Sequence, residues 1–171
     1  WNGLMLKGYV DAYLTFGEQH FLDVATENAK FIVKKQLRKD GGLNHSYKKG
    51  RSTINAYLED YAFIVDAFLK LYEATFDVKW LKEADALMAY SIEHFYDDES
   101  GMFFFTSDED PALIARKMEV NDNVIPASNS VMANNLFLLS HHYGREDYKD
   151  KAAQMLNNVI GDVKSYPSGY S

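Results

Sequence analysis

Three carboxylates stand where they could act on a sugar. Glu59 and Asp60 are neighbours at the start of a strongly apolar segment, and Asp122 lies in a polar loop sequence. Cleavage of a glycosidic bond needs two carboxyl groups about 5 to 10 Å apart across the scissile bond. Because adjacent helical residues point about 100° apart, only one of Glu59 and Asp60 can face a given cavity. We predict a catalytic pair of Asp60 or Glu59 with Asp122. Stabilisation of a helix start, or of a turn at Asp122, is the alternative.

Polar and aromatic residues elsewhere in the chain suit the same chemistry. Carboxylates and amides bond to hydroxyl groups, and aromatic rings pack on apolar faces. The predicted substrate-binding residues are Trp1, Asn2, His45, Arg51, Tyr57, Ser128 and Asn129. Among the five histidines, His45 is the candidate acid or base. Asn55 and Ser128 are also common N-cap residues, so a structural role stays open for both.

Other kinds of site find little support in the sequence. The chain has no cysteine, which excludes disulfides, thiolate zinc sites and thiol nucleophiles within these residues. It contains no glycine-rich phosphate loop and no Gly-x-Ser-x-Gly elbow. His141 and His142 point to different faces of a helix, which argues against a metal pair. We therefore predict no metal and no cofactor.

Composition limits the class of partner. The 171 residues include 18 Lys and Arg against 25 Asp and Glu, a net charge of −7, which disfavours nucleic acid and anionic membranes. Charges interrupt every apolar run before it could span a bilayer, so we expect a soluble, cytoplasmic protein. The chain opens at Trp1 without a charged leader segment, and this predicts an internal portion of a longer protein.

An internal repeat predicts the elements that position these residues. An aromatic residue, an alanine four positions later and a glycine 21 positions after the aromatic occur three times: Phe21, Ala25, Gly42; Trp80, Ala84, Gly101; Tyr148, Ala152, Gly169. Each unit predicts two helices joined by a short turn, at about 3–16 and 20–38, 57–75 and 78–95, and 128–143 and 146–159. Short strands are expected at about 43–47 and 102–106. The three hairpins, at about 3–38, 57–95 and 128–159, are expected to form a single domain of residues 1–171.

The two helices of each pair differ in polarity. Residues 130–143 contain no Asp, Glu, Lys or Arg, whereas the second helix of the first pair carries a charged face. The first helices are therefore predicted inside and the second helices outside. If successive hairpins pack side by side, the inner helices run parallel and their N-termini share one mouth. The long connections 39–56 and 96–127 both reach that mouth, and loops of this length are usually functional.

Five segments, taken in order, resemble the YyaL-type, spermatogenesis-associated proteins that carry an N-terminal thioredoxin-like domain. They are Trp1-Asn2-Gly3-Leu4-Met5, residues 57–63, residues 71–75, Gly101 with residues 103–106, and residues 126–130. That family is similar to the six-hairpin glycosidase superfamily, including N-acylglucosamine 2-epimerases, glucuronyl hydrolases and some cellulases. The resemblance implies an all-α fold in which three helical hairpins form part of an (α/α)6 toroid.

The resemblance also implies a sugar as ligand, with glycoside hydrolysis or sugar isomerisation in the full protein. The family's thioredoxin-like domain and its cysteines are missing from this chain, so it implies no redox activity. Epimerases of this architecture depend on histidines facing the cavity, and no inner helix here begins with one, which favours hydrolysis.

Part of a ring would expose apolar inner surface, so self-association is expected. The alternative is a non-enzymatic interaction module built from stacked hairpins.

Overall fold

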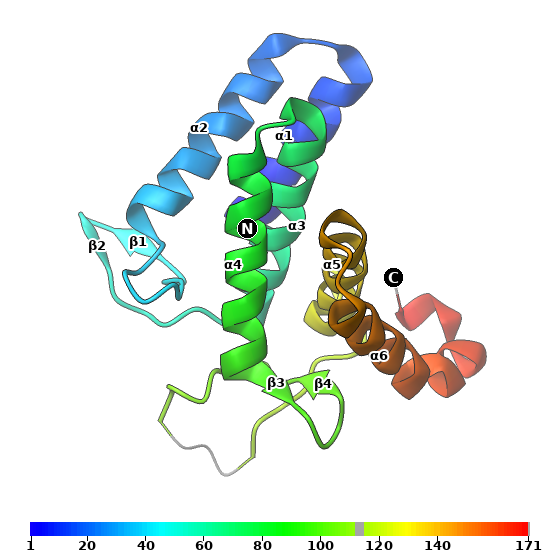
Figure 1. Ribbon diagram of the computed structural model, residues 1–171. Coiled ribbons are helices and arrows are strands. Elements are labelled where there is room, and N and C mark those ends of the chain that lie inside the picture. The colour runs from blue at the N-terminus through cyan, green and yellow to red at the C-terminus, as the bar shows by residue number, and fades with distance from the viewer. Residues whose placement is uncertain (112–114, 171) are drawn as a thin grey trace. The chain divides into compact units, whose positions relative to one another are not determined.

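The computed structural model describes residues 1–111 and 115–170 (Figure 1). The helices are α1 (Asn2–Phe16), α2 (Gln19–Lys35), α3 (Leu58–Thr75), α4 (Val78–Phe95), α5 (Ser128–Tyr143), α6 (Glu146–Ser165) and the short 3-10 helix η1 (Pro167–Gly169). Two-residue strands pair antiparallel in the long connections: β1 (Tyr47–Lys48) with β2 (Arg51–Ser52), and β3 (Tyr96–Asp97) with β4 (Met102–Phe103). The prediction of an all-α fold with small strands between the hairpins is confirmed.

Two predicted boundaries are wrong. Helix α2 ends at Lys35 and not near residue 38, because Gln36 and Leu37 turn into a pairing with the following loop. The backbone N–H of Asn44 donates to Gln36 O at 2.9 Å, and Leu37 forms a bridge with Leu43. Helix α6 continues to Ser165, six residues beyond the predicted end.

The described chain divides into two compact units, Trp1–Tyr90 and Ser91–Ser171, called here the N-terminal and C-terminal units. Helix α3 is the core of the N-terminal unit, since it buries an unbroken run from Tyr61 to Leu69. The ring of Phe68 on α3 packs against that of Trp80 on α4, with centroids 5.4 Å apart. The ring of Tyr61 stacks on that of Tyr90, with centroids 5.5 Å apart. Helix α3 is therefore the inner helix of its pair, as predicted.

Helices α1 and α3 run parallel and in close contact. At Gly3 an added Cβ would lie 2.7 Å from the backbone carbonyl carbon of Phe63, so only glycine fits there without a shift. One turn further along, Lys7 Nζ lies 2.8 Å from Asp66 Oδ2, and the next pair, Asp11 and Lys70, follows in the same direction. The parallel packing predicted for the inner helices is confirmed for this pair.

In the C-terminal unit, α5 and α6 form the third hairpin. Tyr148 and Met155 of α6 are buried, as are Leu136 and Leu139 of α5. Among the residues described, none of the helices combines the length and apolar character needed to cross a bilayer.

The turns within the hairpins lie where the sequence predicts them. Gly17 and Gly144 end α1 and α5 in the left-handed region, with φ of +73° and +65°. Phe76 takes the same conformation at the end of α3, with φ of +55°, although it carries a side chain. That residue is 77% exposed, so its ring gains little from burial.

The repeated glycines meet three different surroundings. A Cβ on Gly42 would lie 2.6 Å from a guanidinium nitrogen of Arg38, and one on Gly169 would lie 2.9 Å from the ring of Tyr166. Gly101 has φ of +68°, and its Cβ would meet the side chain of Gln154 at 2.8 Å. All three positions favour glycine, each for its own reason.

Candidate functional site

The loop before α3 folds back on the start of that helix. His45 N–H donates to Ile54 O at 2.8 Å, and Ala56 N–H donates to Leu43 O at 3.1 Å. The buried Tyr61 hydroxyl accepts the N–H of Leu43 at 2.7 Å. Residues 43–45 and 54–56 are thereby paired, and His45 is brought to the first turn of α3.

A histidine and a carboxylate meet at this position. His45 Nδ1 lies 2.8 Å from Asp60 Oδ2, and the same oxygen accepts the backbone N–H of Tyr57 at 3.0 Å. The side chain of Asp60 is 14% exposed and that of His45 is 38% exposed. The ring of Tyr57 lies edge-on to the imidazole, with centroids 5.3 Å apart.

This geometry fixes how the imidazole can act. A carboxylate can only accept hydrogen bonds, so the bond between the two side chains assigns the hydrogen to Nδ1 of His45. The neutral ring then keeps Nε2 as an acceptor, and the protonated ring donates from it. The His45–Asp60 pair can therefore exchange a proton with a ligand while Asp60 orients the ring.

The structure distinguishes the two neighbouring carboxylates. Asp60 is the third residue of α3 and forms a capping box with Tyr57, which is the N-cap residue. Glu59 is half-buried in the same turn. Asp60 is thus the member that contacts a candidate acid–base group, and it also stabilises the helix start.

A network around Arg38 holds the other side of this loop. Its guanidinium donates to Asp40 Oδ1 at 3.0 Å, to Asn55 Oδ1 at 2.9 Å and to the Tyr90 hydroxyl at 2.7 Å. The hydrogen bond from Arg38, aided by the N–H of Gly42, lowers the pKa of Asp40 from its usual value. The interpretation of Asn55 as an N-cap is wrong, since its side-chain oxygen serves Arg38.

Three other predicted ligand-binding residues of the N-terminal unit lie on the surface. Trp1 is 81% exposed at the N-cap of α1, and Asn2 is exposed with its carbonyl accepting Asn28 Nδ2 at 3.2 Å. Arg51 is exposed on β2. No contact recorded within residues 1–111 and 115–170 joins these three side chains to the His45–Asp60 pair, so their roles stay predictions.

Asp122 holds the start of α5. Its Oδ1 accepts the N–H of Ala127 at 2.8 Å, and its own N–H donates to Gly169 O at 2.9 Å. It belongs to the C-terminal unit, whereas Asp60 belongs to the N-terminal unit. These contacts match the structural alternative for Asp122, and the predicted catalytic pair stays a prediction.

The first residues of α5 are tied to the loop before it. Ser128 N–H donates to Glu119 Oε2 at 3.3 Å, whereas the Ser128 hydroxyl is buried without a hydrogen-bond partner in the described chain. Ala127 is the N-cap residue, so the interpretation of Ser128 as the cap is wrong.

The Asn129 amide is fully used by backbone groups. Its Oδ1 accepts Phe103 N–H at 2.9 Å, and its Nδ2 donates to the carbonyls of Phe103 and Glu119 at the same distance. Asn129 therefore links α5 to β4 and to the long loop. This linking role depends on partners far along the chain, and no local sequence signal indicates it.

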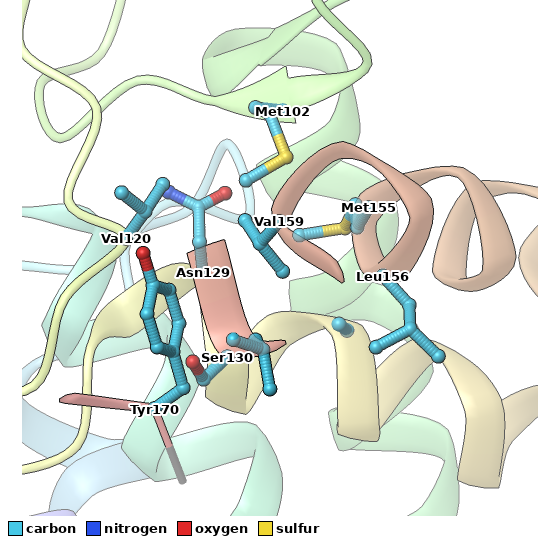
Figure 2. Close-up of a pocket in the computed structure, with 10 residues that line it drawn as sticks. Met102, Val120, Asn129, Ser130, Met155, Leu156, Val159 and Tyr170 are labelled. Atoms are coloured by element: carbon cyan, nitrogen blue, oxygen red, sulfur yellow. The ribbon is translucent and has the colours of Figure 1, made fainter. Parts of the chain in front are cut away.

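The C-terminal unit contains a pocket of about 280 Å³ beside α5 and α6. Figure 2 shows side chains from α6 gathered near the start of α5 and Tyr170. The lining residues are mostly aliphatic or thioether in character: Met102, Val120, Asn129, Ser130, Ala133, Met155, Leu156, Val159, Val163 and Tyr170. Such a lining offers few partners for hydroxyl groups, so the pocket suits a sugar less well than the His45–Asp60 pair does.

Sequence reasoning missed the residues that hold these loops, above all Arg38, Asp40 and Glu119. Arg38 and Asp40 stand two residues apart before a pair of glycines, a pattern that could have indicated a loop closed by an ion pair. Within the described residues, no group of three or more His, Asp or Glu side chains is placed to hold a metal ion.

Curated proteins similar in sequence cover almost the whole chain. Human spermatogenesis-associated protein 20 is 32% identical over 177 residues, which span 98% of this chain and 22% of that protein. The rat protein of the same name is also 32% identical with the same coverage, and an uncharacterised protein of Caenorhabditis elegans is 30% identical over 98% of the chain. The chain thus spans about a fifth of the length of these relatives. No family model matches it.

Solved structures share the fold at low sequence identity. A GH76 alpha-mannanase from Bacteroides thetaiotaomicron superposes with a TM-score of 0.71 and 18% identity, over 94% of this chain and 40% of that one. A cellobiose 2-epimerase from Spirochaeta thermophila superposes with a TM-score of 0.73 and 14% identity, over 92% of this chain and 41% of that one. A D-mannose isomerase superposes with a TM-score of 0.73 and 14% identity, over 92% of this chain and 39% of that one. The chain is therefore similar along nearly all its length to the spermatogenesis-associated proteins, and its three hairpins have the fold of part of an (α/α)6 toroid of the six-hairpin glycosidase type.

Proposed function

We propose that the protein binds a sugar-like, polyhydroxylated ligand at the part of the predicted mouth that residues 43–57 and the first turn of α3 form, and that His45 exchanges a proton with it. The observation that carries this proposal is the 2.8 Å contact between His45 Nδ1 and the mostly buried Asp60 carboxylate. The fold adds support, since structures that share it are named as sugar hydrolases, isomerases and epimerases.

Each group at the mouth has a chemical role in this proposal. Asp60 fixes the tautomer and orientation of the imidazole, and Nε2 of His45 takes a proton from the ligand or returns one to it. Tyr57 supplies an aromatic ring next to the imidazole. General acid–base assistance of this kind contributes about 10²- to 10⁴-fold to a rate.

Proton transfer next to a sugar carbonyl fits these groups better than hydrolysis does. In isomerisation, a base takes the proton from the carbon beside the carbonyl while the carbonyl oxygen gains a proton, which gives an enediol. The proton then returns to the former carbonyl carbon while the neighbouring hydroxyl loses its own proton and becomes the new carbonyl. One acid–base group that works in both directions carries the proton between the two carbons, and water exchanges the protons on the two oxygens. Hydrolysis needs a second carboxylate across the bond, and Asp122 already accepts a hydrogen bond at the start of α5.

The test compares two histidine–aspartate pairs of equal length. His94 Nδ1 lies 2.8 Å from Asp108 Oδ1 in the C-terminal unit, which makes it a matched control for His45. We expect His45→Gln to weaken the binding of mono- and disaccharides in titration calorimetry and to abolish any turnover, with His94→Gln binding as the parent does. Equal behaviour of the two variants would contradict the proposal. Absence of binding across the sugar panel would instead favour the interaction-module hypothesis.

A further inference from the structure

The loop that carries His45 is strongly basic in an acidic protein. Seven of the chain's 18 Lys and Arg residues fall between positions 34 and 51, against the single acidic residue Asp40, although the whole chain has a net charge of −7. We call residues 34–51 the basic segment. Its cations are Lys34, Lys35, Arg38, Lys39, Lys48, Lys49 and Arg51.

Most of these cations form no ion pair with a carboxylate of the described chain. Lys34, Lys39, Lys48, Lys49 and Arg51 are exposed, and none forms an ion pair with a residue in 1–111 or 115–170. Elsewhere, cations pair with carboxylates at Lys7, Lys70, Arg145, Lys149 and Lys151. Exposed cations without an ion pair in the rest of the described chain, Lys30, Lys79, Lys82, Lys117 and Lys164, are spread along the sequence, whereas the basic segment groups the five named above within residues 34–51.

The basic segment has a braced backbone. The rings of Tyr47 and Phe31 meet edge-on with their centroids 5.3 Å apart. Lys35 Nζ lies 5.5 Å from the centroid of the Tyr47 ring. Ser52 Oγ donates to Lys35 O at 2.9 Å, which ties β2 to the end of α2. The turn at Lys49, with φ of +50°, joins β1 to β2. Cations on a braced hairpin lose less entropy on binding than cations on a free loop would.

We propose that the ligand of this mouth carries a negative charge, as a sugar acid or a sugar phosphate does. The inference rests on the proposed function, because it assigns the ligand's charge from the loop that positions His45. Exposed, uncompensated cations attract anions and form charge-assisted hydrogen bonds with carboxylate or phosphate oxygens. An extended polyanion such as nucleic acid would also meet the acidic remainder of the surface, which favours a small anion.

The first experiment measures the affinities of the protein for glucose, glucuronate and glucose 6-phosphate by titration calorimetry. We expect at least one anionic sugar to bind about tenfold more tightly than glucose, the order of one charge-assisted hydrogen bond. Comparing the affinities for glucuronate and for glucose 6-phosphate shows whether the protein prefers a carboxylate or a phosphate. Raising the salt concentration should reduce the preference, because these cations are exposed.

The second experiment changes charge at two positions. Lys48→Gln with Lys49→Gln should bring the ratio of anionic to neutral affinity toward one. The control, Lys82→Gln with Lys164→Gln, removes the same charge from exposed sites outside the basic segment and should keep the ratio. Circular dichroism checks that both double variants are folded.

The outcomes separate the two proposals. Equal affinities for glucose and both anions would overturn the charged-ligand inference and leave the sugar proposal standing. Binding of none of the three would overturn both. A polyglutamate peptide that binds when no sugar does would also overturn both, and would point to an acidic protein partner.

Discussion

A single oxygen of Asp60 accepts hydrogen bonds from the Tyr57 backbone and from the His45 ring. One group thus begins a helix and orients a side chain fifteen residues earlier. Substituting Asp60 disturbs both functions at once, whereas substituting His45 disturbs only the second. Substitution of His45 therefore tests activity more specifically, and substitution of Asp60 has the larger effect on folding.

Asp60→Ala removes the oxygen that accepts the Tyr57 N–H and should lower the free energy of unfolding by about 0.5–2 kcal/mol, the usual cost of losing a side-chain cap at a helix start. His45→Gln should cost less, because the cap remains. Urea unfolding followed by circular dichroism measures both. A larger loss in His45→Gln than in Asp60→Ala would show that the cap is not the dominant role of Asp60.

Asp40 should make stability depend on pH in the acid range. Its pKa is lowered in the folded state by the hydrogen bond from Arg38, so its stabilising effect is fully present above the unfolded pKa. The effect is lost as the pH falls through the folded value, below 3.8. The Asp40→Asn variant should have a lower free energy of unfolding than the parent at pH 7, by less than about 1 kcal/mol because the Asp40 side chain is exposed. This gap in the free energy of unfolding should close near the acid limit. A gap that stays constant with pH would contradict this.

Phe76→Gly should stabilise the protein. The left-handed conformation costs a residue with a Cβ about 1 kcal/mol or more, and the exposed ring offsets little of that. We expect a gain of about 0.5–1 kcal/mol in thermal unfolding. Gly17→Phe, at the equivalent turn of the first hairpin, should show the opposite sign. A loss of stability in Phe76→Gly would mean that the contact with Tyr72 matters more than the backbone does.

At this scale the sequence predicted residue types better than contacts. It indicated Asp60, Glu59 and His45 as candidates, but it could not join His45 to Asp60, because that contact depends on the pairing of residues 43–45 with 54–56. It favoured capping by Ser128, whose place is taken by Asp122 and Glu119 from the preceding loop. Both outcomes depend on backbone pairing between segments that no local pattern specifies.

At the scale of elements, helix α1 contacts α3 backbone to backbone at Gly3. Gly3→Ala would place a Cβ 2.7 Å from the Phe63 carbonyl carbon and force the helices apart, so we expect a loss of about 1–3 kcal/mol. Gly8→Ala is the matched control on the same helix, because a Cβ there meets nothing within 4 Å. That control should gain up to about 1 kcal/mol from helix propensity. Similar effects of the two changes in urea unfolding would rule out the close approach.

The internal repeat and its short turns located the helices, because each repeat unit holds one helical hairpin. The end of α2 and the positions of β1 and β2 were missed. The end of α2 depends on side-chain-to-backbone bonds, and β1 and β2 are defined by their backbone pairing. Gln36 Nε2, for example, donates to the carbonyls of Asn44 and His45 and draws the chain out of the helix. Such bonds link residues eight or more apart and leave no periodic trace.

At the scale of the whole molecule, exposed apolar side chains on α1 predict self-association. Met5 and Phe16 are 58% and 68% exposed and, eleven residues apart, lie within about 20° of each other around the helix. The net charge of −7 opposes close contact between copies, so association should rise with salt. Met5→Lys should reduce the average mass in sedimentation at high salt, with Thr15→Lys as the control of equal charge. A mass independent of concentration would exclude the interaction.

The repeat glycines have a consequence for protein design. Gly42 leaves room for the guanidinium of Arg38, Gly101 supplies a left-handed turn, and Gly169 leaves room for the ring of Tyr166. A consensus hairpin averaged from the three copies would keep the glycine and lose these surroundings, leaving an unfilled gap at the end of each unit. An idealised array would have to choose one copy with its partners and repeat it whole. The first copy suits this purpose, because hydrogen bonds join Arg38 to Asp40 and Tyr90 and join Gly42 to Asp40.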